Sequence, residues 1–105
     1  MDKSDLMLSL LKRYHWGVHR AIPLKALAIA IGVSEREVRK IKNHLVIERR
    51  QPIGSTGDGY FYAENPDELK RFVAEYKSRN KACFEMVRAY EDMLKPQGQL
   101  RLEVG

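Results

Sequence analysis

The chain has 105 residues, and its 19 Lys and Arg against 14 Asp and Glu give a formal net charge of +5. This length corresponds to one domain with little room for a deep catalytic cleft, so we expect no enzymatic activity. The single cysteine excludes an internal disulfide, and the longest apolar stretch, residues 26–33, is too short to span a membrane. The start, residues 1–5, does not resemble a signal peptide, so we expect a cytoplasmic protein without membrane contact.

Two helices are predicted at the start of the chain. Apolar residues at helical spacing, followed by Gly17, predict a first helix over residues 5–16. Pro23 begins a short second helix, whose apolar residues fall on one face and which ends at Gly32. Each helix is therefore expected to turn an apolar stripe toward a core.

The third predicted helix lies in the most basic part of the chain. Ser34 and Glu37 form a capping box that begins a helix over residues 34–48. An apolar stripe at helical spacing gives this helix one buried face. Because residues 35–52 carry six basic and three acidic side chains, we expect a polyanionic partner to bind here.

The pattern changes after the third helix. Residues 51–63 predict two short strands around a glycine-rich turn at residues 54–59, which together make one β-hairpin. Asn65 and Pro66 then begin a fourth helix, which meets no breaker before residue 96.

The predicted fold class is mainly α with a small β-hairpin (α+β). We expect a domain at residues 1–64, a long C-terminal helix at residues 65–95 and a flexible tail at residues 96–105. The long helix is the candidate dimerisation element.

Residues 27–41 resemble a helix-turn-helix. Ala28 is small enough to let two helices approach closely, and Gly32 can adopt the positive φ of the turn. The stretch from residue 22 to residue 62 is similar to the winged helix-turn-helix domains of the biotin operon repressor and DeoR-type regulators. In those domains a Ser-Glu-Arg segment, residues 34–36 here, opens the recognition helix, and a Gly-Tyr pair, residues 59–60 here, closes the wing.

This resemblance implies binding to double-stranded DNA, and with the heptad pattern of the C-terminal helix we expect a dimeric, sequence-specific transcriptional regulator with helix 34–48 in the major groove. It also implies a bacterial source and a phage or other mobile element, where compact winged-helix proteins without a ligand domain are common. Such a regulator is nucleoid-associated when it is bound to DNA. Two alternatives stay open: an accessory DNA-binding factor in phage or plasmid replication or recombination, and a winged-helix adaptor that binds proteins instead of DNA.

The outward face of the third helix supplies the candidate DNA contacts. Arg36 and Arg39 suit bidentate contact with guanine, and Asn43 suits adenine. The predicted phosphate contacts are basic residues that give affinity without sequence preference. The full set from this region is Ser34, Glu35, Arg36, Arg39, Lys40, Lys42, Asn43, Arg49 and Arg50, of which Lys40, Lys42, Arg49 and Arg50 are the phosphate contacts. The alternative is a solvated charged face, which most helices with mixed Glu and Arg have.

The predicted wing offers weaker contacts than the helix. Ser55 and Thr56 can donate hydroxyl hydrogen bonds to phosphate. The turn lacks the Lys or Arg that many wings insert into the minor groove, and Asp58 would repel phosphate. We therefore expect the wing to contribute little to DNA binding.

The predicted fourth helix carries an unbroken heptad pattern. An asparagine at an a position of a coiled coil fixes the register and favours a two-stranded assembly. The predicted homodimer interface consists of Val73, Tyr76, Asn80, Cys83, Val87, Tyr90 and Leu94. The alternative is that the helix packs on its own domain, and we expect its first turns to do so while the later turns pair with a second subunit.

No cofactor or metal is expected. His15 and His19 stand four residues apart, but Gly17 lies between them and no Cys or carboxylate nearby completes a ligand set. The sequence also lacks a nucleophile elbow, a phosphate-binding glycine loop and a zinc-protease motif.

Overall fold

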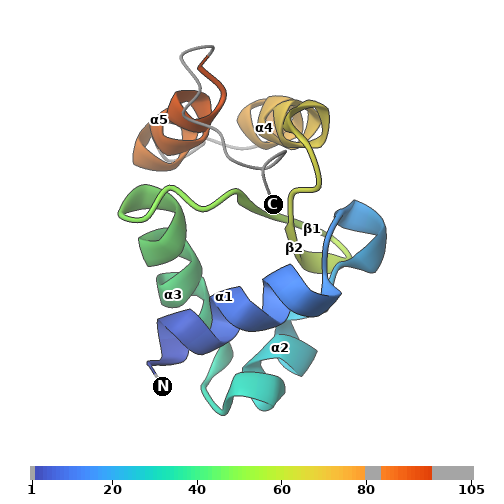
Figure 1. The fold of residues 1–105 in the computed structure, drawn as a ribbon, viewed down its shortest axis with the longest axis vertical. Coiled ribbons are helices and arrows are strands. Elements are labelled where there is room, and N and C mark those ends of the chain that lie inside the picture. Colours follow the sequence, from blue (N-terminus) through green and yellow to red (C-terminus); the bar gives the residue numbers. More distant parts are fainter. Residues whose placement is uncertain (1, 80–83, 96–105) are drawn as a thin grey trace.

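A computed structural model describes residues 2–79 and 84–95 of the chain. Its elements follow the order α1 (Lys3–Tyr14), the 3-10 helix η1 (Val18–Arg20), α2 (Leu24–Ile31), α3 (Glu35–Ile47), β1 (Ile53–Thr56), β2 (Gly59–Tyr62), α4 (Pro66–Arg79) and α5 (Phe84–Met93). The described chain is mainly helical with one two-stranded antiparallel sheet, so the α+β expectation is confirmed. Figure 1 shows α2 at one end of the molecule, α4 and α5 at the other, and the sheet between them.

The capping signals of the sequence locate the ends of α2 and α3. Gly32 ends α2 in the left-handed region with φ +75°. The hydroxyl oxygen of Ser34 accepts a hydrogen bond from the N–H of Glu37 at 3.1 Å, which begins α3. The first helix is displaced from its predicted range, because Asp2 is the N-cap and the helix ends at Tyr14.

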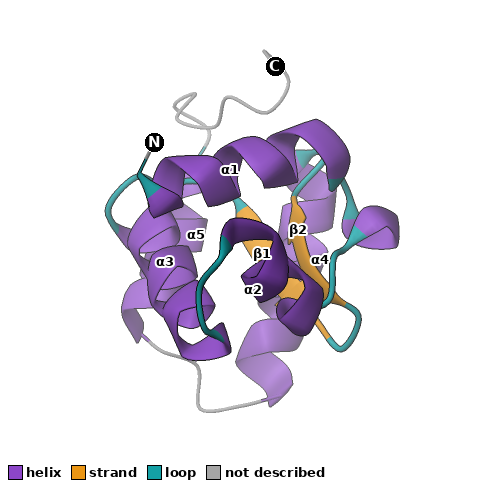
Figure 2. Ribbon diagram, turned by 90° about the horizontal axis from the view of Figure 1, so that it is seen from below, coloured by secondary structure: helices purple, strands orange, loops and turns teal. Residues whose placement is uncertain are grey.

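Strand β2 has partners on both of its edges. On one edge it pairs with β1, from Ile53 opposite Tyr62 to Thr56 opposite Gly59, so the hairpin turn has two residues. On the other edge, Tyr60 and Ile22 exchange two backbone hydrogen bonds of 2.8 Å. The backbone of residues 15–17 also bonds to Tyr62, so the connection between α1 and α2 runs along β2 (Figure 2).

This close approach explains the glycine at position 59. The φ of Gly59 is +128°, a backbone conformation that residues other than glycine rarely adopt. A Cβ atom there would lie 2.0 Å from the carbonyl oxygen of Ile22. The backbone of β2 and the residue before α2 can therefore pair only if position 59 lacks a side chain.

One hydrophobic core joins the whole described chain. Its members come from α1 through to α5, and its largest fully buried side chains include Met7, Leu27, Phe61 and Tyr90. The hydroxyl of Tyr90 donates a 2.6 Å hydrogen bond to the carbonyl oxygen of Ile53 in β1. Helices α4 and α5 therefore complete the core of the first 64 residues and are not an appendage to it.

The expected continuous helix over residues 65–95 is wrong. Lys77 in α4 forms a 3.2 Å ion pair with Glu91 in α5, and the ring of Phe72 lies 5.3 Å from that of Tyr90. Lys77 and Glu91 would be about 21 Å apart along one helix, at 1.5 Å per residue. The segment instead contains two helices that pack on each other, because the aromatic side chains of both contribute to one core.

Three of the seven predicted dimer-interface residues make contacts inside the molecule. Val73 and Tyr90 are buried in the core, and the ring of Tyr76 stacks on Phe72 and contacts Tyr90. These three residues therefore make contacts within the molecule, and the prediction that they contact a second subunit is wrong. Of the other predicted interface residues, Val87 and Leu94 are half-buried, whereas Asn80, Cys83 and the predicted tail at residues 96–105 lie outside the described residues.

None of the helices in the described ranges is both long and apolar enough to cross a membrane.

We predict that Tyr90→Phe lowers the free energy of unfolding by about 1–2 kcal/mol, because the buried carbonyl of Ile53 loses its donor. Urea denaturation followed by circular dichroism measures this loss. The matched control is Tyr14→Phe, since Tyr14 is 57% exposed. Equal stabilities of the two variants would contradict the role assigned to the Tyr90 hydroxyl.

The same variant has a signature at alkaline pH. Burial, with smaller effects of Tyr76 and Tyr60, raises the pKa of Tyr90 well above its ordinary value of 10.0. Above about pH 10 the unfolded chain loses the phenolic proton of Tyr90 while the folded chain retains it, so the free energy of unfolding falls as the pH rises. Tyr90→Phe should reduce this fall; a smaller one remains, because burial also raises the pKa of Tyr60 and Tyr62.

A second pair of variants tests the close approach at β2. Gly59→Ala should cost at least about 3 kcal/mol or prevent folding, because its Cβ meets backbone that cannot move aside. Gly57→Ala, in the same hairpin, meets nothing within 4 Å and should leave the melting temperature nearly unchanged. A Gly59→Ala protein as stable as Gly57→Ala would refute the pairing of Ile22 with Tyr60.

Candidate nucleic-acid interface

The first two turns of α3 carry most of the predicted contact residues on an exposed face. Arg36, Lys40 and Asn43 follow one another at helical spacing and are exposed. Arg39 is exposed beside them, and Ser34 and Glu35 are exposed at the start of the helix. The structure therefore brings these predicted residues together at one end of α3.

The other side of α3 explains why this face stays free. Val38, Ile41, Leu45 and Val46 are buried in the core and pack toward α1, α2 and α5. This buried arc is wider than the three-residue stripe expected from the sequence, because α5 covers a second side of the helix. Only the face opposite the core remains exposed to a large partner.

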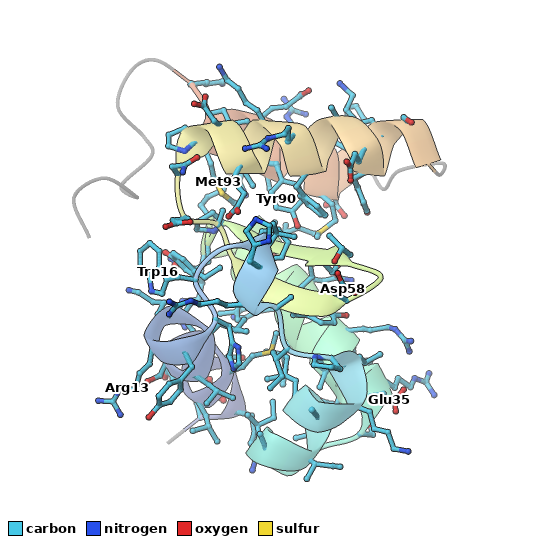
Figure 3. All side chains as sticks on the ribbon, turned by 90° about the vertical axis from the view of Figure 1, so that its right-hand side faces the viewer. Arg13, Trp16, Glu35, Asp58, Tyr90 and Met93 are labelled. Atoms are coloured by element: carbon cyan, nitrogen blue, oxygen red, sulfur yellow. The ribbon has the colours of Figure 1, made fainter. Side chains whose placement is uncertain are left out.

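An electrostatic effect of Arg39 on Tyr60 relates the exposed face of α3 to β2. Burial raises the pKa of Tyr60, and the positive charge of Arg39 partly opposes that increase. The guanidinium of Arg39 is therefore close enough to the phenol of Tyr60 to act on its charge. Figure 3 shows Glu35 and Asp58 on one side of the molecule and Arg13 on the opposite side, so the start of α3 and the hairpin turn share one surface.

The hairpin exposes a carboxylate rather than the predicted hydroxyl groups. Ser55 and Thr56 lie in β1 and are half-buried, although the sequence suggested a longer turn that would contain them. The hydroxyl oxygen of Thr56 accepts a 3.1 Å hydrogen bond from the N–H of Asp58. The exposed turn consists of Gly57 and Asp58, which offers a negative charge at its tip.

Lys42 is not a surface residue, so the expectation that it contacts phosphate is wrong. It is 6% exposed, and its ammonium nitrogen lies 6.0 Å from the ring centroid of Phe72 and 5.8 Å from those of Tyr76 and Tyr90. Cation–π attraction stabilises an ammonium group in such a position. Lys42 therefore connects α3 to α4 and α5. Lys42 stands four residues after Val38 and four before Val46, and this spacing is the sequence signal that could have indicated its burial.

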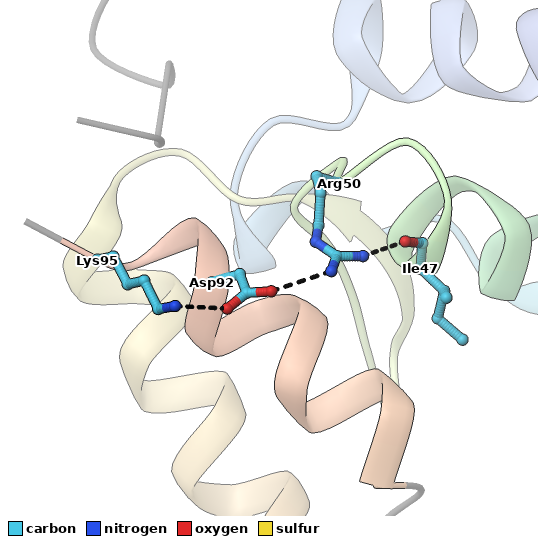
Figure 4. A network of polar contacts seen from close by, with 4 residues as sticks. All are labelled: Ile47, Arg50, Asp92 and Lys95. Carbon is cyan, nitrogen blue, oxygen red and sulfur yellow. Dashed lines mark hydrogen bonds and ion pairs between the residues drawn. The ribbon is translucent and has the colours of Figure 1, made fainter. Parts of the chain in front are cut away.

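Arg49 and Arg50 are engaged with carboxylates of the chain itself. Arg49 pairs with Asp5 of α1 at 2.7 Å. Arg50 pairs with Asp92 of α5 at 2.9 Å and also donates to the carbonyl of Ile47 (Figure 4). Both arginines therefore attach the end of α3 to neighbouring helices, and a phosphate would have to compete with these pairs.

The backbone at Arg50 has an unusual conformation in the turn after α3. Its φ is +51°, the only positive φ of a non-glycine residue in the described chain. Lys95 pairs with the second oxygen of Asp92 at 3.1 Å. Hydrogen bonds from Lys95 and Arg50 lower the pKa of Asp92, so this carboxylate stays charged and holds the turn after α3.

These internal roles leave a face with balanced charge. Of the six basic residues in the range 35–52, one is buried and two are ion-paired within the chain. The three others, Arg36, Arg39 and Lys40, share the surface with Glu35, Glu37 and Asp58. The basic surplus predicted from the sequence is therefore much smaller where a polyanion would meet the protein.

One of the two histidines considered as metal ligands, His15, has a structural role. His15 Nδ1 donates to the carbonyl of Arg20 at 2.7 Å, which closes the turn around η1. Across residues 2–79 and 84–95 there is no group of three or more His, Cys, Asp or Glu side chains placed to hold a metal ion.

Comparisons with known proteins give no relative: no family model, no curated protein and no solved structure matches this chain.

Proposed function

We propose that the chain binds double-stranded DNA, with the start of α3 in the major groove and the hairpin turn beside the DNA backbone. The observation that carries this proposal is the exposed group Arg36, Arg39, Lys40 and Asn43 on a helix face that no described element covers. The left-handed turn at Gly32 between α2 and α3, and the hairpin after α3, support a winged helix-turn-helix arrangement.

The spacing of these side chains suits base reading. Arg36 and Asn43 are separated by two helical turns, about 10 Å along the axis, which corresponds to about three base pairs. Arginine pairs with guanine and asparagine with adenine through two hydrogen bonds each. We therefore assign base contacts to Arg36, Arg39 and Asn43, and a phosphate contact to Lys40.

The charge balance of the face favours a particular binding mode. Three cations next to three carboxylates give little non-specific attraction to DNA, since that attraction scales with the number of neutralised phosphates. Base contacts would therefore supply much of the binding energy. This combination suits a sequence-specific transcriptional regulator better than a protein that coats DNA.

A protein adaptor is the second candidate. The carboxylates of Glu35 and Asp58 on the same side of the molecule favour it, because they oppose a polyanion but would attract a basic protein surface. An accessory factor in replication or recombination would use the same DNA surface as the regulator. It differs from the regulator in binding DNA with little sequence preference.

The deciding experiment is binding of the full chain to a pool of random-sequence duplexes over a salt series, with the bound fraction sequenced. Enrichment of a motif with a shallow salt slope, as expected from the single phosphate contact assigned to Lys40, supports the regulator. Salt-sensitive binding without enrichment supports the accessory factor. No binding at low salt contradicts DNA binding and leaves the adaptor.

Arg39→Ala should cost about 1–3 kcal/mol of specific binding and relax the preference at one base position. The matched control is Arg13→Ala, because Arg13 is exposed on the opposite side of the molecule. Fluorescence anisotropy with the enriched duplex measures both. An unchanged base preference in Arg39→Ala would show that Arg39 contacts phosphate rather than a base.

Asp58→Asn should tighten DNA binding about threefold at low salt, because it removes a negative charge that faces phosphate. Glu85→Gln, which removes an exposed carboxylate at the start of α5, is the control and should not change the affinity. Weaker binding by Asp58→Asn would mean that the hairpin carboxylate makes a favourable contact with DNA.

A further inference from the structure

Helix α2 has an apolar face on its exposed side as well as on its buried side. Leu27, Ala28 and Ile31 are buried in the core. Ala26, Ile29 and Ala30 are exposed, and Ile29 retains 74% of its accessible surface. A surface helix normally carries polar residues on its outer side, but the only charged residue of α2 is Lys25.

The exposed residues form one continuous face. Positions 26, 29 and 30 follow helical spacing, whereas Val33 lies beyond the left-handed turn at Gly32 and packs against the core. We call Ala26, Ile29 and Ala30 the α2 face. Helix α2 forms one end of the molecule in Figure 1, and the view from below in Figure 2 looks directly onto it. No described element lies over the α2 face, and exposed apolar patches of this kind mark interaction sites.

We propose that the α2 face packs against the α2 face of a second copy of this chain, with the two helices antiparallel. A two-fold axis between Ile29 and Ala30 places the large side chain of each copy against the small one of the other. A two-fold interface requires such self-complementarity, and the alanines allow the helix axes to approach closely.

The charges at the two ends of α2 select this antiparallel orientation. Lys25 is exposed at the start of the helix, and Glu35 is exposed just beyond its end. Neither of them forms an ion pair with another described residue. Antiparallel packing brings Lys25 of each copy to Glu35 of the partner subunit, whereas the carbonyl of Ile31 at the end of α2 already accepts a hydrogen bond from Lys3 of its own chain. Parallel packing would instead place the two lysines together.

The size of the α2 face sets the expected strength. Stable protein interfaces bury about 800 Å² on each partner, which is more than one side of an eight-residue helix offers. Association of the free chain is therefore weak, with a dissociation constant of about 0.1–1 mM. It becomes strong when both copies are held on one DNA molecule, and this last step alone rests on the proposed function.

The test uses the full chain without DNA, so that its result does not depend on DNA binding. Sedimentation equilibrium from about 10 µM to 2 mM covers the expected dissociation constant. The native chain should pass from monomer to dimer over this range. Ile29→Glu should remain monomeric throughout, whereas Phe84→Glu should dimerise like the native chain, since Phe84 is equally exposed (75%) but lies on α5 at the other end.

Charge reversal tests the orientation. Lys25→Glu and Glu35→Lys should each weaken dimerisation about fivefold or more, and the double variant should restore it to within about twofold of the native chain. Thermal melting confirms that each variant is folded. A native chain that is monomeric at 2 mM, dimerisation that survives Ile29→Glu, loss of dimerisation in Phe84→Glu, or no restoration in the double variant would each overturn the proposal.

Discussion

Backbone pairing on both edges of β2 determines how the helices and the hairpin lie relative to each other. One edge is paired with β1 and the other with residues 15–22, and the second pairing requires glycine at position 59. Because α2 begins at Leu24, just after Ile22, and leads through Gly32 into α3, this pairing also locates the start of α3. The surface shared by the first turns of α3 and the hairpin turn is therefore a consequence of hydrogen bonds on the edge of β2 that does not pair with β1.

The end of α3 is held by different interactions from its start. Tyr90 and Asp92 of α5 bond to β1 and to Arg50, and Lys42 lies among the aromatic rings of α4 and α5. These contacts use two of the basic side chains that a charge count assigns to a partner, Arg50 and Lys42. A basic segment can thus serve the fold and the surface at once, and the side chains left on the surface are few enough that each has a large effect on what the protein binds.

Local signals in the sequence were sufficient for the elements whose ends depend on neighbouring residues. The capping pair Ser34 and Glu37, the glycine at position 32 and the hairpin were all predicted and are all present. The division of residues 65–95 was missed, because the heptad pattern continues through it without a proline or glycine and only long-range packing, such as that of Tyr90 on Ile53, separates α4 from α5. The burial of Lys42 was missed for the same reason, since the aromatic rings that cover it come from α4 and α5, which follow α3 much later in the chain.

The hydrogen bond between Tyr90 and Ile53 also affects how the sheet behaves toward other chains. Strand edges with free backbone groups recruit further strands and start aggregation. Here β2 is closed on one side by residues 15–22, and the first carbonyl of β1 is bonded to a side chain of α5. β1 is only four residues long and follows Pro52, which has no N–H to offer. A sheet of two strands alone would expose both of its edges to other chains. Here these contacts limit edge-to-edge growth, and α5 contributes to this protection while the chain is folded.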